Sequence, residues 1–319
     1  MSDSAFIPEF NPRSPESPQT STTAQTQIRR LVWKIAFATL LLMAVGSATR
    51  VMNAGLACPD WPLCYGQLVP TQQMNLQVFL EWFHRLDAGL IGLSTLLLVG
   101  WTWYKRKDLP AWLLGSVIFG LGLILVQGAL GAFTVTELLR FDIVTAHLGT
   151  ALLFFCTMLT IGTCLLPTPS SNYPISGSLY WLAPIATVCV YAQSILGGLV
   201  GSRWALHQCL GNSALCQVMN NHIIGVVPAT LSSIGLIVLI WRNPSLPSYC
   251  RHLATITGGL LVSQILLGVA TFKLHLQVEP LTVTHQSIGA TLLGTLVVLT
   301  VTIWRLNNSN LSVSSLQQN

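Results

Sequence analysis

Charged residues are scarce in this chain. Only 8% of its 319 residues are Asp, Glu, Lys or Arg, whereas 52% are hydrophobic. Soluble domains carry roughly 25% charged residues, so the composition excludes an ordinary soluble protein and indicates an integral membrane protein. The net charge of +5 does not indicate a nucleic-acid partner, because the basic residues stand beside apolar runs rather than forming a binding face.

Two further absences narrow the class of protein. No glycine-rich fingerprint follows a predicted strand, since pairs such as Gly197-Gly198 lie inside apolar runs; flavin- and nicotinamide-binding motifs are therefore absent.

Residues 1–28 are rich in Ser, Thr, Pro and Gln and have no apolar run, so they lack the pattern of a signal peptide and are expected to form a disordered cytoplasmic tail.

The apolar residues fall into eight runs, each long enough to span a bilayer, which takes about 20 residues. The composition therefore predicts an all-α membrane protein. The predicted spans are Leu31–Thr49, Trp82–Trp103, Trp112–Phe133, Ile143–Leu165, Leu179–Val200, Asn220–Trp241, Leu253–Phe272 and Val283–Trp304.

A Pro- and Ser-rich segment at 167–178 separates the first four spans from the last four. We therefore expect two tandem four-helix bundles at 29–166 and 179–305, followed by a polar tail at 306–319. Each half has four spans and so the same orientation, which predicts a pseudo-two-fold axis along the membrane normal.

The distribution of basic residues predicts the orientation of the chain. With the N-terminus in the cytoplasm, ten Lys and Arg residues lie on that side and five on the other, and Lys105-Arg106-Lys107 marks a cytoplasmic loop. The positive-inside rule then places both termini in the cytoplasm.

Four histidines inside apolar runs recur at one interval. His84 and His147 are 63 residues apart, as are His222 and His285. Each lies near the outer start of an even-numbered span, so the four share a similar shallow depth. A histidine in a membrane helix is costly and usually functional. Each pair is thus expected to ligate haem iron from both faces, although a structural hydrogen bond is the alternative for any single one.

The repeat extends beyond histidine. The segment Gln127–Gly131 recurs as Gln264–Gly268, and Thr145-Ala146-His147 recurs as Val283-Thr284-His285. These correspondences favour a duplicated unit that presents two imidazoles in each copy. Zinc is less suitable as the ligand, because no cluster around the histidines gives a closed four-ligand set.

Two cysteine pairs lie in outer loops of the predicted topology. Cys58 and Cys64 bracket a short segment in the first outer loop, and Cys209 and Cys216 do so in the third. Disulfides persist on the oxidising side of a membrane, so we expect one disulfide within each pair. Locking the loop is the default role, and a redox role for the first pair is the alternative.

Arg50 and Arg203 occupy matching positions at the outer ends of odd-numbered spans. Each side chain could simply extend to the interface, or it could pair with haem propionates, for which a guanidinium is well suited. Both interpretations are open on the sequence alone.

Glu81 is the asymmetric feature of the two halves. It precedes His84 by one helical turn, whereas its counterpart in the second half is Met219. A carboxylate at the membrane boundary could be exposed and inert. Beside a haem ligand it could instead move protons, which predicts chemistry in the first half and cofactor binding in the second.

The residues between 46 and 85 carry a family resemblance. Gly46-Ser47-Ala48-Thr49-Arg50, the loop Gly55-Leu56-Ala57-Cys58-Pro59-Asp60-Trp61-Pro62-Leu63-Cys64 and Glu81-Trp82-Phe83-His84-Arg85 together resemble the signature of the haem A synthases. The resemblance covers about residues 30–305. The presence of both cysteine pairs makes the chain similar to the bacterial type.

The resemblance implies oxidation of the ring methyl of haem O, through a hydroxymethyl intermediate, to the formyl group of haem A, for terminal oxidase assembly. It further implies that His222 and His285 hold haem b, that His84 and His147 face the substrate haem, and that Glu81 is the catalytic carboxylate. In the second half, Ile223 stands where Arg85 follows His84, which removes one candidate charge partner.

The same resemblance implies partners and a location. The expected partners are haem O, a haem O synthase, an electron donor or acceptor, the lipid bilayer and a second copy of the chain, and the expected location is the bacterial plasma membrane. Two other functions also use membrane histidines: a di-haem electron-transfer cytochrome of a quinol oxidoreductase, and a haem carrier. The cytochrome would not need a carboxylate beside only one pair, and the carrier would bind one haem reversibly and form no product.

Overall fold

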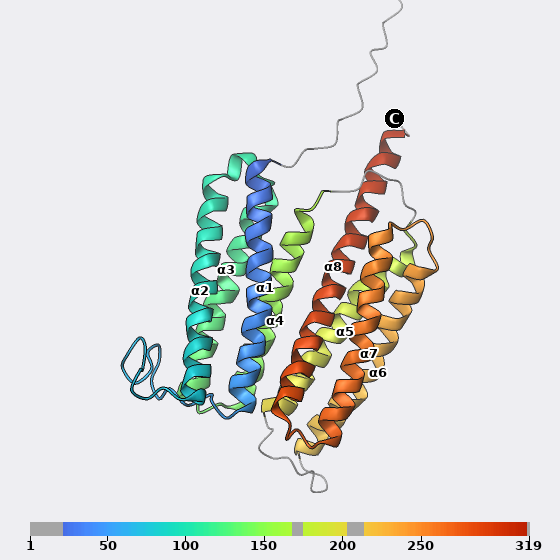
Figure 1. Cartoon of the computed structure of the whole chain (residues 1–319). Helices are drawn as coiled ribbons and strands as arrows, with labels where there is room; N and C mark the ends of the chain where they lie inside the picture. The colour runs from blue at the N-terminus through green and yellow to red at the C-terminus, as the bar shows by residue number, and fades with distance from the viewer. Residues whose placement is uncertain (1–21, 168–174, 203–213, 318–319) are drawn as a thin grey trace, which may run out of the picture.

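A computed structural model describes residues 22–167, 175–202 and 214–317, with side chains described for 22–167, 175–202 and 217–307 (Figure 1). These residues form eight α-helices and one short 3₁₀ helix, η1 (Arg106–Asp108). The α-helices are α1 (Thr23–Val51), α2 (Leu76–Tyr104), α3 (Ala111–Thr136), α4 (Phe141–Cys164), α5 (Gly177–Ser202), α6 (Ala214–Trp241), α7 (Ser248–Lys273) and α8 (Glu279–Gln317).

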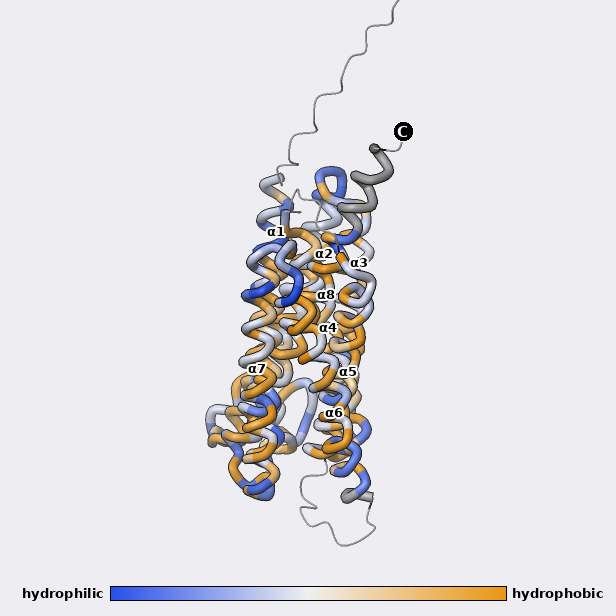
Figure 2. Tube along the Cα trace, turned by 90° about the vertical axis from the view of Figure 1, so that its right-hand side faces the viewer, coloured by the Kyte–Doolittle hydropathy of each residue, from blue (hydrophilic) through white to orange (hydrophobic). Residues whose placement is uncertain are grey.

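All eight helices are long and apolar enough to cross a membrane. The apolar residues dominate their central parts and hydrophilic residues gather toward the ends (Figure 2). Large apolar side chains remain exposed on the helices, such as Leu97 and Phe119, as expected where lipid rather than water surrounds them. The predicted class, an all-α membrane protein with eight spans, is therefore confirmed.

The helices pack in two neighbouring groups. Contacts join α1 with α2, α2 with α3, α3 with α4 and α4 with α1, and the same cycle joins α5, α6, α7 and α8. Between the groups, α8 contacts α1 and α4, and α4 also contacts α5. Helices α1–α4 accordingly lie on one side of the molecule and α5–α8 on the other (Figure 1). The functional division of 29–166 from 179–305, and its pseudo-two-fold axis, stay predictions.

The helices begin earlier than the apolar runs that predicted them, and at α1 and α2 a polar side-chain cap sets the first residue. The Thr22 hydroxyl accepts the amide of Gln25 at 3.1 Å, so α1 starts at Thr23. The expectation of a disordered tail through residue 28 is thus wrong for residues 23–28. The Asn75 side chain likewise accepts the amide of Val78 at 3.0 Å and starts α2 six residues before the predicted span. At the other end, α8 continues through most of the expected polar tail 306–319.

Three arginines bond to carbonyl oxygens at helix ends: Arg305 and Arg50 do so between the two groups of helices, and Arg29 within the first group. Arg305 of α8 donates to the carbonyl oxygen of Thr163, and Arg29 of α1 to that of Leu165, at the carboxyl end of α4. At the opposite end of the molecule, Arg50 of α1 donates to the carbonyl of Ser202, the last residue of α5, at 2.7 Å. A cation at a helix carboxyl end satisfies unpaired carbonyls and complements the helix dipole.

The α3–α4 and α7–α8 turns have the same backbone. Leu138 and Leu139 have φ values of 51° and 59°, and His275 and Leu276 have values of 52° and 60°. The amide of Leu139 donates to Thr134, and that of Leu276 to Thr271, five residues back in both cases. Positive φ is uncommon for residues other than glycine, so the shared conformation is a local structural repeat that supports duplication.

The four intramembrane histidines share one depth. His84, His147, His222 and His285 lie six to eight residues after the first residues of α2, α4, α6 and α8. These helices all start at the end of the molecule where the loop between α1 and α2 lies, opposite the described chain ends (Figure 1). At 1.5 Å per residue the rings lie roughly 10 Å along each helix.

Candidate active site

Each intramembrane histidine packs against a glycine of the helix that precedes its own. The imidazoles approach so closely that a Cβ atom on any of these glycines would lie 2.8–3.3 Å from a ring carbon. At position 46 a Cβ atom would be too close to the ring to be accommodated without a shift, and at the other three positions it would press tightly on the ring, so glycine best admits the imidazole against the backbone. The pairs are Gly46 with His84, Gly131 with His147, Gly197 with His222 and Gly268 with His285.

The two histidines of the first pair face one another. The ring centroids of His84 and His147 are 6.4 Å apart, with an angle of 65° between the planes. Because a metal–imidazole bond is about 2 Å long, two imidazoles on opposite sides of one metal ion have centroids about 6 Å apart. The structure therefore brings the predicted partners of the first pair together. The pairing of His222 with His285 stays a prediction.

The ring nitrogens retain unused hydrogen-bonding capacity. Among the described residues, the Nδ1 atoms of His84, His147 and His285 are buried and have no hydrogen-bond partner. Burying an unpaired polar atom is unfavourable, above all where no water can reach it. Half-buried imidazoles that retain ring nitrogens without a partner are suited to hold a haem.

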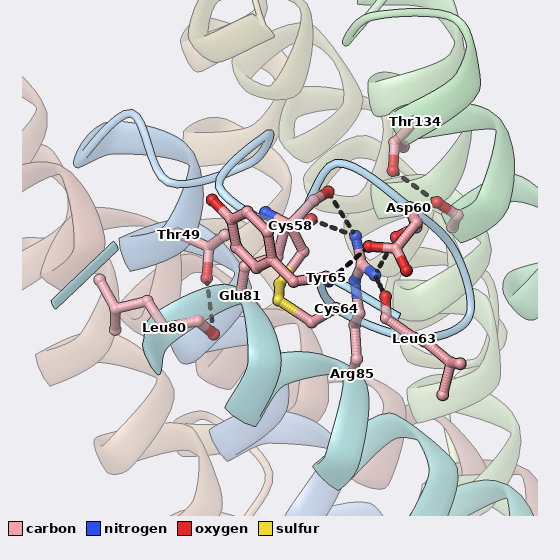
Figure 3. A network of polar contacts seen from close by, with 11 residues as sticks. Thr49, Cys58, Asp60, Leu63, Cys64, Tyr65, Leu80, Glu81, Arg85 and Thr134 are labelled. Atoms are coloured by element: carbon pink, nitrogen blue, oxygen red, sulfur yellow. Dashed lines mark hydrogen bonds and ion pairs between the residues drawn. A yellow bond between two sulfur atoms is a disulfide. The ribbon is translucent and has the colours of Figure 1, made fainter. Parts of the chain in front are cut away.

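Glu81 is buried, with 3% of its surface exposed, which rules out the interpretation of an exposed, inert carboxylate. Its Oε1 atom forms an ion pair with Arg85 at 2.5 Å, one turn further along α2, and its Oε2 atom accepts the backbone amide of Cys58 at 2.8 Å. Both oxygens thus bind donors, and the carboxylate joins α2 to the loop between α1 and α2 (Figure 3).

Arg85 organises that loop. Besides Glu81, its guanidinium donates to the carbonyl oxygens of Cys58, Asp60 and Leu63 (Figure 3). The side chain is 14% exposed, so these contacts are shielded from water. One guanidinium therefore positions three backbone carbonyls of the loop beside the helix that carries His84.

The Cys58–Cys64 disulfide is present, as predicted. Within the closed loop, the Asp60 carboxylate accepts the amides of Tyr65 at 2.6 Å and Gly66 at 2.7 Å. These amides, Gly66 first, hold the pKa of Asp60 below its usual value. The disulfide and the Asp60 turn together fix the loop that contacts Glu81.

The two arginines predicted to bind haem propionates and the remaining cysteines are only partly described by the structure. Arg50 donates to Ser202, while its buried Nε atom has no partner among the described residues. Arg203 and Cys209 lie outside the described residues, and the side chain of Cys216 does too. The predicted Cys209–Cys216 disulfide therefore stays a prediction. Four other cysteines are free thiols, as expected: Cys156, Cys164, Cys189 and Cys250.

Asp87 is a feature that the sequence analysis missed. It lies on α2 one turn after His84 and lines a groove of about 230 Å³ between α1 and α2, together with Lys34, Ser94 and apolar side chains. The available signal was an acidic residue inside an apolar span, which is rare and usually functional.

Fold and site together define a multi-pass membrane protein with paired histidines suited to haem. The family model described as cytochrome oxidase assembly protein (COX15-CtaA) matches residues 29–297. The chain is 30% identical to the haem A synthase of Shewanella oneidensis, over 85% of this chain and 95% of that protein. It is 25% identical to the haem A synthase COX15 of Mus musculus, over 82% of this chain and 77% of that protein.

A haem A synthase of Shouchella clausii is 26% identical, over 76% of this chain and 86% of its own length. The chain belongs to the haem A synthase family. The resemblance carried by the Cys-Pro-Asp-Trp-Pro-Leu-Cys loop and the Glu-x-x-His-Arg motif is confirmed, as is the expected class of enzyme, an oxidoreductase.

The Gly46–His84 contact yields a first prediction. A valine at position 46 would place side-chain atoms where the imidazole now lies, so Gly46→Val should displace His84 and weaken haem binding at the first pair roughly tenfold or more. The measurement is a spectral titration of purified protein with haem. Gly89→Val is the matched control, because a Cβ atom there meets nothing within 4 Å. Equal affinities of the two variants would contradict the steric role.

The Asp60 turn yields a prediction on pH. The pKa of Asp60 is lowered in the folded loop, so the ionised carboxylate stabilises the folded loop. This stabilisation is fully present above the pKa of an Asp side chain in the unfolded chain, about 4. It is lost as the pH falls through the lower pKa that Asp60 has in the folded loop. Hydrogen exchange at the amides of Tyr65 and Gly66, corrected for intrinsic rates, should accelerate over that range. In Asp60→Asn the pH-dependent step should be missing; its persistence would assign the transition to another group.

Proposed function

We propose that the two histidine pairs divide the haem A synthase reaction of this chain. His84 and His147 face the substrate, haem O, whose ring methyl is oxidised through a hydroxymethyl group to the formyl group of haem A. His222 and His285 hold a resident haem b. The observation that supports this most directly is the seating of four paired imidazoles against four glycines at one depth.

Haem b bound by His222 and His285 would supply a redox centre that accepts electrons from the oxidation in the first half. The chain's own residues prepare that site. Gly197 and Gly268 let the two rings pack against α5 and α7. His222 and His285 would hold the haem, and the haem would supply the redox chemistry.

Glu81 is the proposed catalytic carboxylate. Oxidation of the methyl carbon releases protons and creates positive charge near the reacting group. An adjacent carboxylate can accept a proton or stabilise the positive charge. Glu81 lies one turn from His84, and Arg85 and the Cys58 amide hold its position. Met219 occupies the counterpart in the second half, which agrees with a purely cofactor-binding role there.

Arg50 is a proposed propionate ligand of the substrate haem. Its Nη2 atom is used on Ser202, but its buried Nε atom remains available to a carboxylate. A guanidinium held in place by one contact and open on another edge suits an anionic group. Arg203, which follows Ser202 in the chain, is proposed to serve the haem b side in the same way.

The same proposal includes a location and partners. The disulfide loop and the histidines lie at the end of the molecule opposite the described termini (Figure 1). We place this end at the outer, oxidising face of a bacterial plasma membrane, with both termini in the cytoplasm. A haem O synthase would supply the substrate, an external acceptor would remove the electrons, and a second copy of the chain is a further candidate partner.

Pigment analysis tests the activity as a whole. Co-expression with a source of haem O should yield extractable formyl haem, whereas an electron-transfer cytochrome or a haem carrier would yield haem without a formyl group. Chromatography of extracted haems distinguishes these outcomes.

Haem b should depend on the second histidine pair. His222→Ala and His285→Ala each remove one axial ligand, so the low-spin haem b spectrum of the purified protein should disappear. His252→Ala is the matched control, because His252 is exposed on α7. An unchanged low-spin spectrum in both ligand variants would assign haem b elsewhere.

Glu81→Gln should bind haem yet fail to oxidise it. Glutamine can still accept the Cys58 amide, and Arg85 keeps its three loop carbonyls, so the fold should survive while the ionisable group is lost. Acid–base assistance contributes roughly 10²–10⁴ in rate, and a loss of that size is expected in haem A formation, with haem b undisturbed. Exposed Glu137→Gln is the control. Wild-type haem A yield from Glu81→Gln would leave Glu81 a purely structural role.

A further inference from the structure

The loop between α1 and α2, residues 52–75, exposes large apolar and aromatic side chains. Leu68 is 81% exposed, Trp61 49%, Val69 47% and Tyr65 41%. Exposed apolar side chains that gather on one segment mark a surface that contacts lipid or another molecule. These four residues are called the apolar loop residues below.

The same loop carries almost no charge. Asp60 is the one charged residue in the sequence 52–75, and its carboxylate is used on the amides of Tyr65 and Gly66. The turn between α3 and α4, at the same end of the molecule, has the opposite character. Three charged side chains are exposed at that turn: Glu137, Arg140 and Asp142. A surface without free charge can leave water at little cost, whereas a charged turn cannot.

The loop folds back along α2 instead of extending beyond the end of the helix (Figure 1). The indole nitrogen of Trp82 donates to the carbonyl oxygen of Leu68 at 2.7 Å, and Arg85 donates to the carbonyls of Asp60 and Leu63. Trp82 and Arg85 lie six and nine residues after the first residue of α2. At 1.5 Å per residue, the loop therefore lies roughly 9–14 Å along the helix.

This position is the boundary of the hydrocarbon core of a bilayer. Helix α2 has 29 residues and is about 43 Å long, whereas the core is about 30 Å thick, so the ends of α2 extend into the headgroup region. The apolar run of α2 starts at Trp82. Next to it, the exposed rings of Phe79 and Phe83 stack with centroids 5.7 Å apart. The loop thus lies beside the helix where headgroups meet acyl chains.

Polar backbone groups of the loop are paired within the protein along this contact. Arg85 and Trp82 together bind four loop carbonyls, and Glu81 accepts one loop amide. Cys64 and Gln67 bond to each other in both directions. An unpaired backbone group is costly where water is scarce. The pairing therefore lowers the cost of placing the loop at the membrane boundary.

We propose that this loop binds the lipid bilayer itself, with the apolar loop residues inserted between the phospholipid headgroups and the outer ends of the acyl chains. Trp and Tyr are enriched at this boundary because their rings are apolar and carry one polar group. Apolar burial of this kind holds interfacial segments on a membrane. The loop is then an anchor that sets the depth of Glu81 and Arg85 in the bilayer, whichever haem the histidines bind.

Photocrosslinking of the full chain in native membranes tests the proposal. Benzoylphenylalanine in place of Leu68 or Val69 captures the molecules within its reach on illumination, and mass spectrometry identifies them. Both side chains are exposed, and the described contacts at these positions use backbone carbonyls, so the loop should keep its fold. Phospholipid adducts are expected at both positions, in yields similar to those at Leu97, an exposed apolar position within the span of α2.

Glu137 is the matched control at the same end of the molecule. Its side chain is exposed on the charged turn, so benzoylphenylalanine there should capture phospholipid in several-fold lower yield. Yields at positions 68 and 69 as low as at position 137 would overturn the proposal. Adducts with a second copy of the chain, or with another protein, in place of lipid would also overturn it.

A charge placed on the surface provides a second measurement. With benzoylphenylalanine in place of Trp61, the combined variant Leu68→Glu and Val69→Glu should lower the lipid yield several-fold, because two carboxylates oppose insertion. The combined variant Leu68→Val and Val69→Leu keeps the surface apolar and should leave the yield unchanged. Equal yields in the charged and apolar variants would contradict insertion of the loop.

Discussion

The close contact between an imidazole and a glycine backbone is the constraint on which the site depends. A histidine within the bilayer must point into the protein, and a side chain of that size needs space between two adjacent helices. The four glycines provide this space, because the ring packs where a Cβ atom would otherwise lie. The helices can then stay close, the four rings lie at matching positions along their helices, and His84 and His147 face one another.

A second organising contact lies where α2 meets the loop from α1. Arg85 and Glu81 form a buried ion pair, and burial of charge is favourable only when the remaining hydrogen-bonding groups are satisfied. Here the guanidinium also binds three loop carbonyls and the carboxylate binds an amide. The pair therefore has few spare donors or acceptors, and the disulfide loop becomes part of the wall of the site. Removal of Arg85 would leave Glu81 buried without its cation, which explains why the two residues occur on one turn of one helix.

Much of this organisation could be predicted from single residues and spacing. Apolar runs gave the eight spans, the 63-residue interval gave the histidine pairs, and the oxidising side of the predicted topology gave the Cys58–Cys64 bond. The early start of α1 could not be predicted by hydropathy, since Thr22 acts through a cap and the first turn is polar. Contacts between helices were also beyond reach: nothing in the local sequence shows that Gly46 faces His84 or that Arg50 meets the end of α5. Glycine is common in membrane helices, so its presence alone does not identify a contact.

The paired left-handed turns after α3 and α7 bear on the history of the chain. Leu138-Leu139 and His275-Leu276 share a backbone that neither sequence favours, since a left-handed conformation costs about 1 kcal/mol or more for each residue with a Cβ atom. Independent origins of two turns that each hold two consecutive left-handed residues would require the same unfavourable choice twice, although the hydrogen bonds themselves also recur at the end of α1, where the amide of Ala54 donates to Thr49. A single ancestral turn, copied with its four-helix unit, requires it once. The side chains of the two turns differ while the path of the backbone is the same, so the backbone extends the repeat already visible in the segments Gln127–Gly131 and Gln264–Gly268.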